Sequence, residues 1–144
     1  APRGKAWQHF VNVTGATYLG NDELRLVSKK RLLMSSTDLE YALLARASGE
    51  ALARNYAGFA ITQIGYKQDF DLFRIPPPLV MISPLRSYAE LQEHRLRQMS
   101  RFGRVRRMTF VIALIDRETL EKEGGFDADE THSAMIDLRA KHYD

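Results

Sequence analysis

The most hydrophobic segment of the chain, Met108 to Ile115, restricts the folds that the sequence can adopt. It contains the longest apolar run, Phe110 to Ile115, which is far shorter than the roughly 20 residues of a membrane-spanning helix. Both faces of a strand over this segment would be apolar, as in a strand that has neighbours on both sides. We therefore expect a central strand here, and no transmembrane segment in the chain as given.

Two segments near the N-terminus are typical of an antiparallel hairpin. Between Trp7 and Tyr18, bulky or β-branched residues recur at alternate positions, which predicts a strand. Gly20-Asn21-Asp22 is a turn signal, and Leu24 to Val27 predict the second strand.

A first helix is expected after this hairpin. Thr37 and Glu40 have the spacing of a capping box, which satisfies two amides at a helix start. The helix is expected to run to about Arg54, because Asn55 tolerates the left-handed conformation that ends helices and residues 56–64 read as a strand. Its predicted core-facing stripe consists of Leu43, Leu44, Ala47 and Ala51.

A second helix is expected after a proline-rich connector. Ile75 to Pro78 cannot form an interior strand or helix, because prolines lack amide donors. A short apolar stretch over residues 79–82 follows, then Ser87 as a helix cap and Gly103 as the helix end. The expected apolar side of this helix comprises Tyr88, Leu91, Leu96, Met99 and Phe102.

The order of these elements favours an α+β fold, a two-layer sandwich with a mostly antiparallel sheet packed by two main helices. The 144 residues fit one domain, expected over residues 1–124. Residues 1–107 carry 17 basic and 9 acidic side chains, whereas residues 108–144 carry 4 and 9. Residues 125–144, after the Gly124-Gly125 break, are therefore expected to form an acidic C-terminal extension.

Several kinds of chemistry are excluded or unsupported by the residues present. The chain has no cysteine, which excludes disulfides, zinc–thiolate sites, iron–sulfur clusters and a cysteine nucleophile. The four histidines lie in different elements and no catalytic motif is found, so we expect no enzyme, no metal and no cofactor. The alternative is an enzyme whose site the sequence does not reveal, with residues that could include Glu50, Asp69, Asp71 and His94.

The basic segment between Arg86 and Arg107 holds seven arginines against Glu90 and Glu93. A helix would place Arg97, Arg101 and Arg104 on one face, and arginine forks suit phosphates and carboxylates. The alternative is a solvated helix face with no ligand. The candidate partner- or anion-binding residues are Arg95, Arg97, Arg101, Arg104, Arg106 and Arg107.

The segment from Asp38 to Ile61 resembles the core of a family of small uncharacterised bacterial cell-envelope lipoproteins. That family has a helix followed by a strand that carries phenylalanine, and it prefers glycine where this chain has Asn55. With one residue inserted around Ala45 and another around Ser48-Gly49, the matching residues are Tyr41, Leu43, Leu44, Arg46, Ala47, Glu50, Tyr56 and Phe59. The resemblance implies an exported envelope protein with no assigned activity.

The start of the chain, Ala1-Pro2-Arg3-Gly4-Lys5, is typical of a mature protein after signal-peptide removal. We therefore expect a periplasmic or outer-membrane-associated protein that acts as an accessory or assembly subunit on a larger protein partner or as a homo-oligomer. The alternative is a module that binds nucleic acid or an anionic surface through the arginine-rich helix, and peripheral membrane association is compatible with both.

Overall fold

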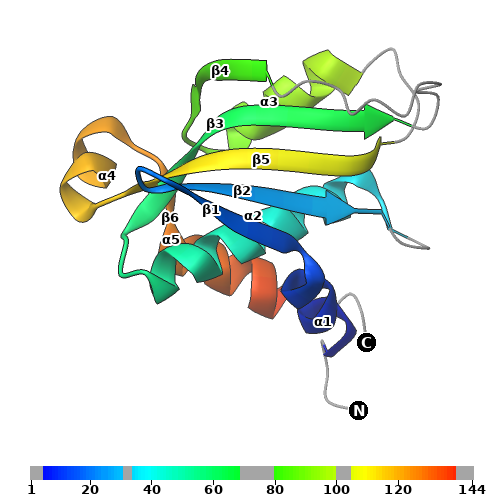
Figure 1. Ribbon diagram of the computed structural model, residues 1–144, viewed down its shortest axis with the longest axis horizontal. Coiled ribbons are helices and arrows are strands. Elements are labelled where there is room, and N and C mark those ends of the chain that lie inside the picture. The colour runs from blue at the N-terminus through cyan, green and yellow to red at the C-terminus, as the bar shows by residue number, and fades with distance from the viewer. Residues whose placement is uncertain (1–4, 31–33, 69–79, 100–104, 139–144) are drawn as a thin grey trace.

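The computed structural model describes residues 5–30, 34–68, 80–99 and 105–138 (Figure 1). Within these residues, six strands form one antiparallel sheet in the order β1-β2-β5-β3-β4, with β6 paired to β3. The strands are β1 (Gly15–Gly20), β2 (Glu23–Lys29), β3 (Gly58–Gln68), β4 (Val80–Leu85), β5 (Val105–Ile115) and β6 (Phe126–Asp127). The predicted α+β fold with an antiparallel sheet is confirmed.

Helices pack on one face of this sheet. The longest helix, α2, contacts β2, β3 and β5, and α1 and α5 pack in turn against α2. Figure 1 shows α1, α2 and α5 together on one side of the strands. The helices are α1 (Lys5–Val13), α2 (Ser36–Ala53), α3 (Tyr88–Met99), α4 (Arg117–Glu123) and α5 (Ala128–Ser133), which continues as a π-helical turn, η1 (Ala134–Leu138).

The strand predicted over Trp7–Tyr18 is wrong in its first half, which is helix α1, and β1 begins only at Gly15. The buried residues of this segment are Trp7, Phe10, Val11 and Thr14, a helical i, i+3, i+4, i+7 spacing. The predicted hairpin itself is confirmed, because β1 pairs with β2 across the turn at Gly20-Asn21-Asp22.

Helix α2 begins two residues before the predicted capping box. Its N-cap is Ser35, whose hydroxyl accepts from the Asp38 amide at 3.2 Å, while the Asp38 carboxylate accepts from the Ser35 amide at 2.9 Å. Asp38 thus takes the N3 position of the capping box that Glu40 was expected to fill. The predicted end is confirmed, because the helix stops at Ala53 and Asn55 has a φ of +63°.

Strand β5 lies at the centre of the sheet, as predicted. Its inward side chains are buried against the predicted apolar stripe of α2, which is also buried. The buried residues of these two rows are Met108, Phe110, Ile112 and Leu114 on β5 and Leu39, Leu43, Leu44, Ala47 and Ala51 on α2.

Helix α3 begins after Ser87, whose hydroxyl accepts from the Glu90 amide at 3.3 Å, so the predicted cap is confirmed. Its predicted apolar side is correct at Leu91, which is fully buried, but wrong at Leu96, which is 68% exposed. Since Leu91 and Leu96 are five positions apart, they lie on different sides of a helix. The Met99 side chain, the 75–78 connector, Phe102 and Gly103 lie outside the described residues.

The boundary expected at residue 124 does not mark the edge of the core. Phe126 and Ala128 belong to the same buried cluster as α2 and β5, and the Phe126 ring stacks on Phe59 at 4.9 Å. The Trp7 indole N–H donates to the Met135 carbonyl at 2.7 Å, so this segment also holds α1. The described part of the expected extension therefore packs into the domain.

Replacing Phe126 with alanine tests this packing. We expect Phe126→Ala to lower the free energy of unfolding by about 3 kcal/mol, since it removes a buried ring and leaves a cavity. The control Leu96→Ala, at an exposed site, should change it by less than about 0.5 kcal/mol. Urea denaturation measures both, and a Phe126→Ala effect as small as the control would show that the Phe126 ring does not contribute to the core.

Candidate functional site

Three cations form a row across the face of the sheet opposite to α2. Arg107 on β5 is the direct cross-strand partner of Lys29 on β2 and of Lys67 on β3. The next residues in register, Ser28, Met108 and Tyr66, point to the helices, so the three cations lie on the other face. Neighbouring strands are about 4.8 Å apart, which places the row within roughly 10 Å. We call Lys29, Lys67 and Arg107 the basic row.

The basic row has no acidic counterpart in the part of the chain that the structure describes. No carboxylate there forms an ion pair with Lys29, Lys67 or Arg107. Like charges that face each other on adjacent strands destabilise a sheet by roughly 0.2–1 kcal/mol for each pair. An anion bound from outside would remove this repulsion.

The four predicted binding arginines that the structure describes, Arg95, Arg97, Arg106 and Arg107, do not come together as one face. Arg95 turns inward, with only 14% of its side chain exposed, and Arg97 is exposed on the same helix. Arg101 and Arg104 lie outside the described residues, so the predicted helical face stays a prediction. Arg106 is exposed next to Arg107, the one member of the set that belongs to the basic row.

A second polar cluster is buried between α2 and α3. The Arg95 Nε lies 3.4 Å from Oε2 of Glu40, which is fully buried, and the Arg95 Nη1 donates to the Thr37 hydroxyl at 2.7 Å. Burial raises the pKa of Glu40 to about 7, against the weaker lowering effects of Arg95 and then of Tyr88. This cluster ties the start of α2 to α3.

Aromatic and imidazole groups complete the buried cluster. The Tyr66 hydroxyl lies 3.3 Å from Nδ1 of His94, and the Tyr41 and Tyr88 rings are 5.8 Å apart. Burial, and then the charge of Arg97, lower the pKa of His94, while burial raises the pKa values of Tyr66 and Tyr88. A carboxyl with a pKa near neutrality can serve as an acid or base, but Glu40 has no exposed surface for a substrate to reach. The cluster is therefore structural in this conformation.

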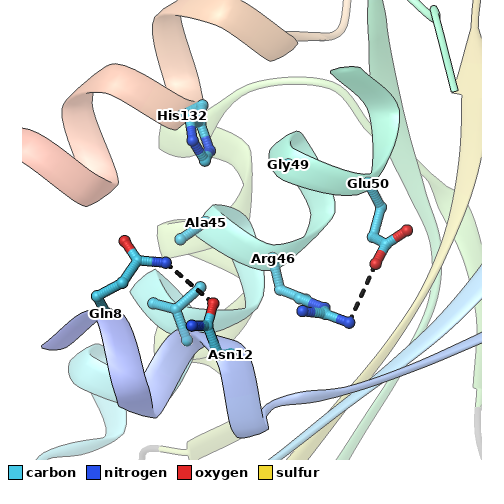
Figure 2. Close-up of a pocket in the computed structure, with 8 residues that line it drawn as sticks. Gln8, Asn12, Ala45, Arg46, Gly49, Glu50 and His132 are labelled. Carbon is cyan, nitrogen blue, oxygen red and sulfur yellow. Dashed lines mark hydrogen bonds and ion pairs between the residues drawn. The ribbon is translucent and has the colours of Figure 1, made fainter. Parts of the chain in front are cut away.

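A pocket of about 210 Å³ lies between α1, α2 and α5 (Figure 2). Small residues of α2 leave space between this helix and α5. A Cβ atom on Gly49 would lie 3.5 Å from the His132 ring. Figure 2 shows Gln8, whose amide donates to Asn12 at 2.9 Å, and Arg46, whose Nη2 lies 3.1 Å from Glu50. The lining residues are Gln8, Val11, Asn12, Ala45, Arg46, Gly49, Glu50 and His132.

The described residues that line this pocket include no serine, threonine, cysteine or lysine. The Ser48 hydroxyl, 3.4 Å from His132 Nδ1, donates to the Ala45 carbonyl at 2.9 Å and is fully buried. Glu50 is engaged by Arg46 and by Arg54 at 2.9 Å.

The four residues proposed for a hidden enzyme site are not brought together where they are described. Glu50 lines the pocket and His94 lies in the buried cluster, while Asp69 and Asp71 are outside the described residues. Within the described ranges, no group of three or more histidine, aspartate or glutamate side chains could hold a metal ion.

Sequence reasoning missed Lys29, Lys67 and Glu40. The two lysines are 38 positions apart in the chain and meet only through the register of three strands. The burial of Glu40 could have been predicted, because Glu40 precedes Leu43, Leu44 and Ala47 at the helical spacing of the buried stripe. A carboxylate at a core position predicts a buried partner such as Arg95.

The pKa of Glu40 predicts a pH dependence of stability. The folded state binds the proton more tightly than the unfolded state, whose pKa is near 4.5. The contribution of the protonated Glu40 carboxyl to the free energy of unfolding is therefore fully present below pH 4.5. About 3 kcal/mol of this free energy is lost as the pH rises through 7. Glu40→Gln removes this titration, so the stability of the natural chain minus that of the variant should fall between pH 4.5 and 7.5. Urea denaturation over this range measures it, and a difference that rises with pH would show that attraction to Arg95 outweighs burial.

In the described residues, no helix is both long enough and apolar enough to cross a membrane. No protein-family model, curated protein or solved structure significantly matches the chain. The resemblance to envelope lipoproteins therefore stays a prediction.

Proposed function

We propose that this protein is a non-enzymatic accessory protein of the bacterial cell envelope whose basic row docks on an anionic surface, the phosphates of membrane lipids. The observation that carries the proposal is the alignment of Lys29, Arg107 and Lys67 on three adjacent strands without a described carboxylate beside them. Like charges on adjacent strands lower folding stability, and the binding of an external anion would account for such a row.

The surroundings of the basic row favour a planar array of phosphates over single-stranded nucleic acid. The next row on the same face is Val27, Thr109 and Gly65, and the one after it contains Arg25, Val111 and Gln63. None of these residues is aromatic, whereas proteins that bind single strands stack bases on aromatic side chains. Lysine and arginine near an anionic bilayer are each worth about 1 kcal/mol.

The location in the envelope is proposed from the sequence. It is supported by the resemblance of residues 38–61 to envelope lipoproteins. Attachment through charge would be peripheral, and it would weaken with salt because surface charges are screened beyond about 10 Å at 0.1 M.

Vesicle binding tests the proposal. The protein should co-sediment with vesicles of phosphatidylglycerol in phosphatidylcholine, and not with phosphatidylcholine alone. Each of Lys29→Gln, Lys67→Gln and Arg107→Gln should weaken binding about fivefold, since each removes about 1 kcal/mol. The matched control is Arg117→Gln, which removes a charge from α4 that is paired with Asp127 at 3.2 Å. It should leave binding unchanged.

Other outcomes would replace the proposal. A larger loss of vesicle binding in Arg97→Gln than in Arg107→Gln would place the site on the predicted arginine-rich helix instead. Tighter binding to a single-stranded oligonucleotide than to the vesicles would favour the nucleic-acid alternative. Equal binding to neutral and anionic vesicles, or binding indifferent to salt, would rule out a site based on the basic row.

A further inference from the structure

Strand β1 is an edge of the sheet that lacks the usual protection against pairing. Within the described residues it pairs only with β2, so its outer backbone groups are unpaired by any strand. Its six residues, Gly15–Gly20, include no charge and no proline, the features that normally block an edge. The opposite edge, β4, contains the exposed Pro84 and is protected in that way.

Exposed apolar side chains collect at the same edge. Four large apolar residues are exposed in the described part of the chain, and three of them, Val13, Tyr18 and Leu19, lie on β1 or directly before it. Each has between 46% and 50% of its surface exposed, and the fourth, Leu96, lies on α3. An unprotected edge flanked by apolar side chains is a surface for adding a strand.

We propose that β1 pairs with β1 of a second copy of this chain, antiparallel, to form one continuous sheet across a homodimer. A twofold axis perpendicular to the sheet produces this pairing, and both partners then use the same residues. Pairing centred on Thr17 would place Thr17 of the two copies opposite each other and Ala16 of each copy opposite Tyr18 of the other.

Charge complementarity favours a second copy in this orientation. Gly15 lies at the end of the sheet where Lys29 and Arg107 are found, and Gly20 lies at the end with Asp22 and Glu23. Antiparallel pairing reverses one copy, so the acidic turn of each chain comes level with the basic end of the other. A parallel arrangement would instead place like charges at the same level.

The dimer is independent of lipid binding but would strengthen it. The twofold axis keeps the two open sheet faces on the same side, so both basic rows would face one surface. Two rows on one rigid body bind a planar target with higher avidity than one row alone.

Sedimentation equilibrium of the full chain, without lipid, tests the interface. The natural chain should be in a monomer–dimer equilibrium, and Leu19→Lys should weaken the dimer by at least about tenfold, because a charge replaces apolar contact at the edge. Leu96→Lys is the matched control, with the same substitution at an exposed site on α3. It should dimerise like the natural chain.

Crosslinking provides a second readout, since the chain has no natural cysteine. Thr17→Cys should form disulfide-linked dimers under mild oxidation. Arg25→Cys should not, although Arg25 is the exposed cross-strand partner of Thr17 one strand further in. A natural chain that stays monomeric at every concentration, an unchanged dimer in Leu19→Lys, or equal crosslinking at positions 17 and 25 would each overturn the proposal.

Discussion

The pairing of β5 with β2 on one side and β3 on the other is the interaction on which the rest of the structure depends. It turns Phe110 and Ile112 toward α2, where they are fully buried, and it aligns Arg107 with Lys29 and Lys67 on the other face. A shift of the register by one residue would exchange these faces and bury the cations. The packing of the core therefore also fixes the basic row.

Elements with a strong local pattern could be predicted from the sequence. Strand β5 followed from its apolar run, and the β1–β2 hairpin followed from the turn at Gly20-Asn21-Asp22. Helix α1 was missed because Trp7 and Val11 fit both a strand and a helix, and the burial of Phe10 and Thr14 distinguishes the two. Residues 126–136 were missed as core because few of them are apolar, although Phe126 is stacked on Phe59.

The candidate site was only partly predictable, because it depends on contacts between distant segments. Arg107 was among the predicted anion-binding residues, but the position of its neighbours requires the strand register. Arg95 could have been recognised as inward-facing, since it follows the buried Leu91 by four residues. Two of the predicted arginines therefore differ in their surroundings. Arg95 is paired with the buried Glu40, whereas Arg107 lies on the open face of the sheet without a described carboxylate as partner.

We infer that the basic row lowers the free energy of unfolding and that only an external anion offsets this loss. Thermal melting of Arg107→Gln, without any ligand and at low salt, tests it most directly. The variant should melt at the same temperature as the natural chain or higher, because two cross-strand repulsions are removed. A melting temperature lower by roughly 5 °C or more would contradict the account, since Arg107 would then stabilise the fold.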